Sequence, residues 1–361
     1  MKQKVLIIGG GNIGTEFACE FAAAGYEVNL YTSHPEKFHT DISMVDSSGK
    51  VLCEGRIAMA TNDIRRAMAG CLLVFVIVPA FMFRQIADLI EPYVTVETCI
   101  GVVPGTGGAE FAFSGCMDKG AVLFGLQRVP GVARLVEYGS KVCVEGKRDE
   151  LFLASIPGNR ATELSRIIEE VIRIPCHKLP NYLNVTLTPS NPILHTTRLR
   201  TLFGDYREGV YYGRNPLFYG EWSMESSELL LACDDELNDL KAALDPMDLS
   251  LVKSLRVHYE SQDAQQLTEK IRSIRSLHDL KSPMKLTEKG WIPDFQSRYF
   301  CADFPYGLAI LIGIADILHV QVPHMEDTMK WYKELTGDRS KLDLHILGIT
   351  CKDDFCRLYS K

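Results

Sequence analysis

The stretch KVLIIGGGNIG, residues 4–14, decides the fold of the first half of the chain. An apolar run ends in the spacing Gly9-x-Gly11-x-x-Gly14, and a helical stretch follows immediately. In this arrangement Gly9 permits a tight turn, Gly11 lets the backbone approach a pyrophosphate, and Gly14 lets the helix pack against the strand. The motif therefore predicts a strand, a turn and a helix that together bind a dinucleotide.

The helix of this motif opens at Asn12 and Ile13, whose backbone N–H groups we expect to face the pyrophosphate, because a helix N-terminus attracts anions. If the coenzyme were NAD, an acidic residue should end the second strand and bind the ribose 2′-hydroxyl. Thr32, Ser33 and Lys37 follow that strand instead. Their side chains can donate hydrogen bonds to a 2′-phosphate, which favours NADP. If Thr32 and Ser33 only cap the next turn, either NADP or NAD fits.

Beyond the motif, residues 1–125 alternate between short apolar runs and helical stretches, which is typical of a parallel sheet with crossover helices. Most of the runs are almost continuously apolar, as in strands covered on both faces. The predicted strands are Lys4–Ile8, Glu27–Tyr31, Arg56–Ala60, Cys71–Val78, Thr98–Val103 and Ala121–Leu126. The predicted helices are Ile13–Ala24, Asp63–Ala69 and Phe81–Glu91, and a β-rich piece at 141–157 precedes a helix at 161–173.

After about residue 180 the pattern changes, because helical periodicity dominates and strand-like runs nearly vanish. Several prolines between residues 175 and 192 indicate an irregular connection. We therefore expect an α/β Rossmann domain with a doubly wound, mostly parallel sheet over residues 1–180, and an all-α domain over residues 181–361. The predicted helices of the second domain are Glu225–Leu244, Leu249–Glu260, Ala264–Leu277, Tyr306–His319 and His324–Leu335.

The composition restricts the classes of partner. The net charge of −7 gives no general attraction to nucleic acid or anionic lipid. The apolar runs at 72–83 and 306–320 are interrupted and too short to span a bilayer, and the first strand is too short for a signal peptide. Eleven cysteines without CxxC pairs suit reduced thiols better than disulfides or a metal site. We therefore expect a cytoplasmic protein with small-molecule substrates and no bound metal.

Two segments of the second half look unlike helix packing, because they place ionisable groups beside prolines and aromatic residues. Residues 188–195 end at His195, and residues 297–307 contain Asp303. Reduction of an imine or ketone by hydride requires a proton donor near neutral pH, and histidine is suited to that task. A carboxylate on the other ring nitrogen would fix the tautomer and stabilise the protonated imidazole. A loop or core histidine satisfied by the backbone is the alternative interpretation.

Asn191-Pro192 followed by His195 resembles the N-P-x-x-H element of the octopine/nopaline (opine) dehydrogenases, and Arg298-Tyr299 with Asp303 resembles their R-Y-x-x-E-D segment. Ala302 stands where that family often has Glu. Further similar segments are Gln127-Arg128-Val129-Pro130 with Arg134, and Val322-Pro323 with Asp327. The resemblance implies a Rossmann domain joined to an all-α opine dehydrogenase domain, and the reductive condensation of an amino acid with a 2-oxo acid. It also implies that His195 is the catalytic acid and Asp303 its partner.

The candidates for substrate binding are Arg298 and Gln127. Arg298 could hold a substrate carboxylate through two parallel hydrogen bonds, or pair with an acid such as Asp294. Arg198 and Arg200 could also meet a carboxylate if they face the cleft, but we interpret them as solvated surface residues. Five aromatic residues fit packing or a homodimer contact better than a pocket lining: Tyr211, Tyr212, Phe218, Tyr219 and Trp222.

Two other functions stay open. A ketopantoate-reductase-like or glycerol-3-phosphate-dehydrogenase-like reductase shares the same domain order but typically relies on a lysine, which neither candidate segment contains. A nucleotide-sensing protein without catalysis would have no need of His195 and Asp303.

Overall fold

The computed structural model describes residues 3–188, 191–339 and 341–360, and the chain divides into two compact units. The first unit runs to Thr186 and includes the chain again from Leu358, and the second unit runs from Leu187 to Arg357. We expected the boundary after residue 180. In the structure, helix α7 (Leu183–Thr186) still belongs to the first unit, and the boundary follows it.

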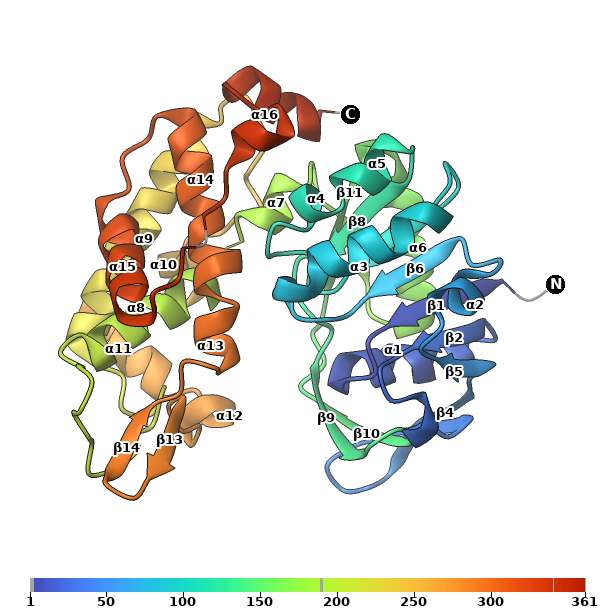
Figure 1. Cartoon of the computed structure of the whole chain (residues 1–361), viewed down its shortest axis with the longest axis horizontal. Coiled ribbons are helices and arrows are strands. Elements are labelled where there is room, and N and C mark those ends of the chain that lie inside the picture. The colour runs from blue at the N-terminus through green and yellow to red at the C-terminus, as the bar shows by residue number, and fades with distance from the viewer. Residues whose placement is uncertain (1–2, 189–190, 340, 361) are drawn as a thin grey trace. The chain divides into compact units, whose positions relative to one another are not determined.

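The first unit is built on an eight-stranded sheet in the order β12-β11-β8-β7-β6-β1-β2-β5 (Figure 1). Every neighbouring pair is parallel except β11 with β8. The strand order reverses between β1 and β6, which is where doubly wound sheets bind nucleotides. The strands are β1 (Lys4–Ile8), β2 (Glu27–Tyr31), β5 (Met59–Thr61), β6 (Leu73–Val76), β7 (Cys99–Val102), β8 (Val122–Leu126), β11 (Leu151–Ile156) and β12 (Cys176–Lys178).

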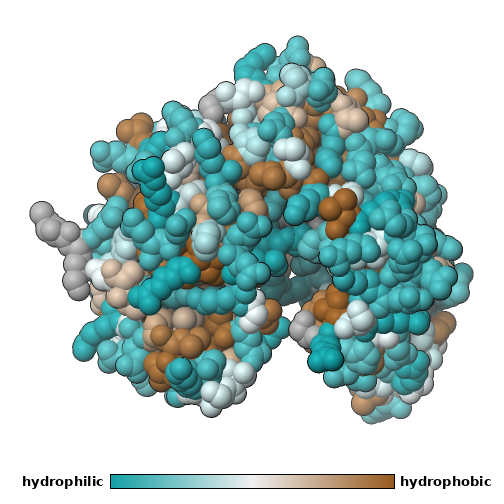
Figure 2. Space-filling model, turned by 180° about the vertical axis from the view of Figure 1, so that it is seen from behind, coloured by the Kyte–Doolittle hydropathy of each residue, from teal (hydrophilic) through white to brown (hydrophobic). Residues whose placement is uncertain are grey.

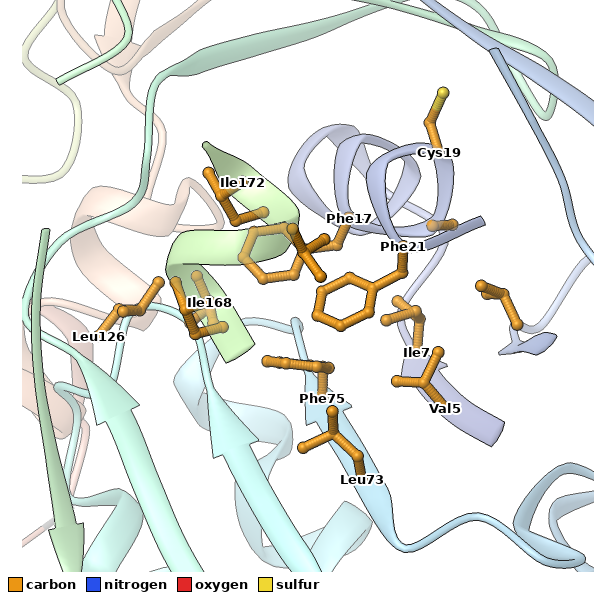
Figure 3. Packing of buried hydrophobic residues seen from close by; sticks show 14 of the residues in the cluster. Val5, Ile7, Phe17, Cys19, Phe21, Leu73, Phe75, Leu126, Ile168 and Ile172 are labelled. Atoms are coloured by element: carbon orange, nitrogen blue, oxygen red, sulfur yellow. The ribbon is translucent and has the colours of Figure 1, made fainter. Parts of the chain in front are cut away.

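Helix α1 (Asn12–Ala23) packs on one face of this sheet. Phe17 and Phe21 lie four residues apart, hence on one side of the helix, and their ring centroids lie 5.4 and 4.9 Å from that of Phe75 on β6 (Figure 3). Helix α6 (Ala161–Ile172) adds Ile168 and Ile172 to the same cluster. The other helices of the unit are α2 (Ile64–Met68), α3 (Phe83–Ile90), α4 (Ala109–Ala112) and α5 (Ser114–Asp118).

A second sheet of the first unit was not predicted. It has the order β4-β3-β10-β9, and its strands are β3 (Asp41–Val45), β4 (Val51–Arg56), β9 (Val132–Glu137) and β10 (Lys141–Glu145). The predicted strand Arg56–Ala60 is wrong, because the chain leaves β4 at Arg56 and enters β5 at Met59. Strand β4 has no fully buried residue, so its sequence lacks the continuous apolar run on which the prediction depended.

The second unit is mainly helical, as Figure 1 shows. Its helices are α8 (Asn191–Phe203), α9 (Met224–Ala243), α10 (Leu255–His258), α11 (Ala264–Arg272), α12 (Arg275–His278), α13 (Arg298–Cys301), α14 (Ala309–Leu318), α15 (Pro323–Thr336) and α16 (Lys352–Tyr359), the last of which crosses back into the first unit. A hairpin of β13 (Met284–Thr287) and β14 (Gly290–Pro293) interrupts them. The helix predicted at Leu249–Glu260 is reduced to α10, a single turn.

Helix α8 corrects our interpretation of the segment that ends at His195. Residues 189 and 190 lie outside the described part, but a helix begins at Asn191 and continues through His195. Pro192 suits the first turn of a helix, because an N–H group at that position has no partner within the helix. Residues 193–199 are all buried, so the segment lacks the one-sided apolar pattern that identifies a surface helix.

Residues 298–318 are long and apolar enough to cross a membrane, by length and composition only. More than half of the most apolar window of this stretch is buried inside the protein, and the core helix of a globular unit has the same composition. On the face in Figure 2, hydrophilic residues predominate and hydrophobic ones form scattered patches. All eleven cysteines lie in the described part of the chain as free thiols, and in that part no group of three or more His, Cys, Asp and Glu could hold a metal ion.

Candidate active site

The glycine-rich turn that joins β1 to α1 is closely packed at two of its glycines. Gly9 has a φ of 113°, and a Cβ atom there would lie 2.3 Å from the Ile77 carbonyl oxygen. A Cβ atom on Gly14 would lie 1.8 Å from the Gly9 carbonyl oxygen. A Cβ atom on Gly11 would meet no heavy atom within 4 Å. Gly9 and Gly14 are therefore required by packing, whereas Gly11 leaves an open space beside the first turn of α1.

The first turn of α1 is suited to an anion. Gly11 is the N-cap residue and offers no side chain to its N–H groups, and no acidic residue lies in the first turn. The side-chain oxygen of Asn12 accepts a hydrogen bond of 2.9 Å from the Leu135 N–H, which ties α1 to β9. The backbone N–H groups near Asn12 and Ile13 fit the pyrophosphate of a nicotinamide dinucleotide, because they lie at the carboxyl end of β1 beside the reversal of strand order.

The residues expected at the ribose follow β2. Thr32 is 5% exposed, and its hydroxyl accepts a hydrogen bond of 3.4 Å from the His34 N–H, so it closes the turn locally. Ser33 is exposed. Lys37 ends a short 3₁₀ turn at Pro35–Lys37 and is exposed, with its ammonium group 5.8 Å from the centre of the Tyr138 ring. Ser33 and Lys37 are open to solvent, and so are His34 and Glu36 between them, whose Nδ1 and Oε1 atoms lie 3.4 Å apart.

Glu16 lies one turn beyond the glycine-rich loop and is fully buried. Burial, with a smaller contribution from Glu20, raises the pKa of Glu16 to about 8. The carboxyl group is therefore mainly uncharged at pH 7. An anion at the N-terminus of α1 would then meet no repulsion from this residue.

We predict that Glu16→Gln increases stability at high pH. Because the folded state holds the proton more tightly than the unfolded state, wild-type stability should fall as pH rises from about 4.5 to about 8. At pH 9 the free energy of unfolding of the variant should exceed that of the wild type by on the order of 3–5 kcal/mol, and near pH 4, below the unfolded-state pKa, the two should be nearly equal. Urea denaturation at the two pH values measures this effect. The exposed residue Glu163, changed to Gln, is the control; equal profiles for all three proteins would contradict the prediction.

His195 and Asp303 lie side by side although 108 positions separate them in sequence. The distance from His195 Nδ1 to Asp303 Oδ2 is 2.8 Å, and the two side chains are 9% and 17% exposed. An ionised carboxylate only accepts hydrogen bonds, so Nδ1 carries the proton and donates it. The Nε2 atom is therefore the one that can exchange a proton during a reaction.

A π-helical turn, η5 (Phe304–Leu308), presents Asp303 to helix α8. The Leu308 N–H donates to the Asp303 carbonyl oxygen across five residues, at 2.8 Å. A Cβ atom on Gly307 would lie 2.8 Å from the Cβ atom of Pro192, so this turn presses on the first turn of α8. The close approach sets the separation of His195 and Asp303, and π turns are frequent at functional sites.

Tyr219 is a site residue that the sequence reasoning assigned to packing. Its hydroxyl lies 2.8 Å from His195 Nε2, and the Tyr299 ring lies 4.5 Å from the imidazole between centroids. Burial raises the pKa of Tyr219, and Tyr299 and Asp303 raise it further. No sequence signal distinguished Tyr219 from the other aromatic residues of its segment. Only the fold brings its hydroxyl to the histidine.

Arg198 is not a solvated surface residue as expected, because it is 3% exposed. Its guanidinium donates to the carbonyl oxygens of Phe218 and Glu221 at 3.0 and 2.8 Å, and to the Ser226 hydroxyl at 3.2 Å. Burial lowers the pKa of Arg198 to about 10, so it is still charged at pH 7. Arg198 therefore holds the segment that carries Tyr219.

The two expected substrate residues lie in different units. Arg298 opens α13 and is exposed, and among the described residues no carboxylate lies within ion-pair distance of its guanidinium, Asp294 included. Gln127 directly follows β8 in the first unit, and its side-chain N–H donates to the Asn184 carbonyl oxygen at 3.0 Å. Arg298 shares a unit with His195 and Asp303, and Gln127 shares a unit with the glycine-rich loop.

Comparison with known proteins covers both units. Residues 178–336 match the family model described as NAD/NADP octopine/nopaline dehydrogenase, alpha-helical domain, and residues 4–107 match that of the NAD-dependent glycerol-3-phosphate dehydrogenase N-terminus. The octopine dehydrogenase of Mizuhopecten yessoensis is 28% identical, over 96% of this chain and 94% of that protein. The opine dehydrogenase of Haliotis discus hannai is 26% identical, over 93% and 91% of the two chains.

A solved octopine dehydrogenase, in complex with NADH and L-arginine, has the same fold. The TM-score is 0.84 at 24% identity, over 98% of this chain and 96% of that chain. The match extends over both units in chain order, as the sequence resemblance does. The chain therefore carries, at residues 178–336, the alpha-helical domain of the NAD/NADP octopine/nopaline dehydrogenases, and it is similar to octopine dehydrogenases along both units.

Proposed function

We propose that this protein catalyses the reductive condensation of an amino acid with a 2-oxo acid, and that His195 is the general acid. The hydrogen bond of His195 to Asp303 carries the proposal, because it leaves Nε2 as the nitrogen that exchanges protons. A bound nicotinamide coenzyme supplies the hydride. His195 then supplies the proton that the reduced nitrogen requires, and Asp303 stabilises the imidazolium until the proton leaves.

Arg298 is proposed as the group that binds a substrate carboxylate. Its guanidinium is exposed and has no carboxylate partner among the described residues, so it is free to hold one from the substrate. Gln127 is proposed as a second substrate contact, although its side chain is bound to a backbone carbonyl. The glycines Gly9, Gly11 and Gly14, with Asn12 and Ile13, would hold the coenzyme pyrophosphate.

A substrate screen tests the proposed function. Pyruvate and other 2-oxo acids, each combined with a panel of amino acids, should oxidise NADPH or NADH only when both substrates are present. L-arginine with pyruvate is the first pair to try, because solved octopine dehydrogenases were studied with these ligands. Turnover with a 2-oxo acid alone would instead favour a ketopantoate-reductase-like or other simple reductase. The absence of turnover with every pair, together with tight coenzyme binding, would favour a nucleotide-sensing protein.

For the coenzyme we propose a preference for NADPH over NADH. The end of β2 offers the hydroxyl of Ser33 and the ammonium group of Lys37 to solvent, and both can donate to a 2′-phosphate. Thr32 adds no negative charge that would repel this phosphate. We further propose a cytoplasmic location. Phe218, Tyr219 and Trp222 are buried within the second unit, so of the aromatic segment only Tyr211 and Tyr212 are left for a homodimer contact.

We predict that Thr32→Asp reverses this preference. The new carboxylate would repel the 2′-phosphate and accept hydrogen bonds from a free 2′-hydroxyl, and it can still accept from the His34 N–H as Thr32 does. The variant should bind NADH about tenfold more tightly than NADPH, a difference of about 1.4 kcal/mol. Titration of coenzyme fluorescence measures both affinities, with Thr32→Asn as the uncharged control. A wild-type protein that binds NADH tenfold more tightly than NADPH would contradict the proposal.

A further inference from the structure

We propose that Tyr219 is a further catalytic residue, whose hydroxyl passes the proton of His195 to the substrate. The proposal rests on the proposed function, since it concerns the proton that the condensation reaction consumes. Both ring nitrogens of His195 already have a partner. Asp303 takes Nδ1 and the Tyr219 hydroxyl takes Nε2, each at 2.8 Å.

The surroundings of the imidazole leave little room for another route. As whole residues, His195 and Tyr219 are each 7% exposed. The rings of Phe218 and Tyr299 lie 5.6 and 4.5 Å from the imidazole between centroids. A substrate atom could therefore hydrogen-bond to Nε2 directly only if Tyr219 moved away.

The segment that carries Tyr219 is held from several sides, so such a movement would be costly. Arg198 lies three residues after His195 on α8 and binds the carbonyl oxygens that flank Tyr219, those of Phe218 and Glu221. Next in the segment, Trp222 is fully buried, and its indole N–H donates to the Ser227 hydroxyl at 3.0 Å. Helix α8 thus positions both the imidazole and the tyrosine that contacts it.

The chemistry of Tyr219 suits a relay better than an independent acid. Burial and the neighbours Tyr299 and Asp303 raise its pKa, so its hydroxyl keeps the proton at neutral pH. Ionisation to a phenolate would be unfavourable, but a concerted transfer avoids it. The Tyr219 O–H proton moves to the nitrogen of the neutral imine as hydride adds to the imine carbon. In the same step the Nε2–H proton of the imidazolium moves to the Tyr219 oxygen.

This step balances. The imine gains one hydride and one proton and becomes a secondary amine. Tyr219 ends as it began, and His195 ends neutral with its Nδ1–H still bound to Asp303. One proton from solvent then restores the imidazolium.

The test uses Tyr219→Phe in the full-length enzyme, with pyruvate and the amino acid that gives the highest turnover in the screen. Phenylalanine keeps the ring that packs on Phe218 and removes only the hydroxyl. We expect the single-turnover rate of NAD(P)H oxidation to fall about 10- to 100-fold, with substrate KM changed less than about threefold. The matched control is Tyr212→Phe, which removes a half-buried hydroxyl of the same unit and should leave the rate unchanged.

A second measurement compares the solvent isotope effects of the wild type and of Tyr219→Phe. If two protons move together, the single-turnover rate of the wild type should depend on the deuterium fraction of the solvent along a curve, and that of Tyr219→Phe along a straight line. A linear dependence for the wild type, or a rate for Tyr219→Phe within about twofold of wild type, would overturn the relay. Wild-type turnover with an unaffected variant rejects only the role of Tyr219. No wild-type turnover with any substrate pair rejects the proposed function and the relay with it.

Discussion

Replacement of His195 by alanine is expected to lower kcat by about 10²–10⁴-fold, which is the usual loss when a general acid is removed. Alanine removes the imidazole that links Asp303 to Tyr219, so the proton for the reduced substrate would have to come from water. The coenzyme Kd should change less than about twofold, because His195 belongs to the second unit and the glycine-rich loop to the first. Steady-state kinetics with NAD(P)H, together with fluorescence titration of the coenzyme, measures both quantities.

The exposed residue His345, changed to alanine, is the matched control, since it lies in the same unit. It should keep wild-type kcat. If His195→Ala kept near-normal turnover at saturating substrates, the histidine would be structural and the proposed mechanism would have to be withdrawn. A large loss of coenzyme affinity in His195→Ala would also contradict the proposal that the first unit binds the coenzyme and that His195 of the second unit acts only on the substrate.

Asp303→Asn should produce the second-largest loss, on the order of 10²-fold or more in kcat. Asparagine keeps the size of the side chain but cannot neutralise the imidazolium, and its amide can donate to Nδ1 and so select the wrong tautomer of His195. The acidic-to-neutral limb of the pH profile of kcat should shift as well, because the carboxylate no longer stabilises the protonated form. Measurement of kcat across pH 5–9 tests both expectations.

Thermal unfolding of Asp303→Asn should resemble that of the wild type, since the substitution leaves the packing of η5 on α8 in place. Asp316→Asn, an exposed change on α14, is the control and should leave the pH profile unaltered. Unchanged kcat and pH profile in Asp303→Asn would show that the hydrogen bond to His195 is not used in catalysis.

The sequence by itself determined the nucleotide loop and five adjacent strands of the central sheet, but not the edge strands β5 and β12. The strands β1, β2, β6, β7 and β8 are buried on both faces, so their apolar runs are visible without any tertiary information. Gly14 is required because it packs against the Gly9 carbonyl oxygen, and Gly9 is required because it packs against the Ile77 carbonyl oxygen at the end of the adjacent strand. Both contacts are made by the turn itself, so a short motif identifies these glycines. Helix α9 was predicted to within one residue at each end, and in the structure the Ser223 side chain caps its N-terminus by accepting from the Ser226 N–H.

The tertiary structure alone decided the rest. The second sheet depends on pairing of β3 with β10, about a hundred residues later. Its strand β4 has no fully buried residue, so the sequence there lacks the apolar run that identifies a buried strand. Residues 193–199 of helix α8 are all buried, so the pattern that marks a surface helix is absent from this stretch. Tyr219 reaches His195 because Arg198 holds its segment, and Asp303 reaches it because Gly307 lets a π turn approach Pro192. Local sequence patterns report which side chains are buried, whereas hydrogen bonds between distant segments depend on how those segments pack.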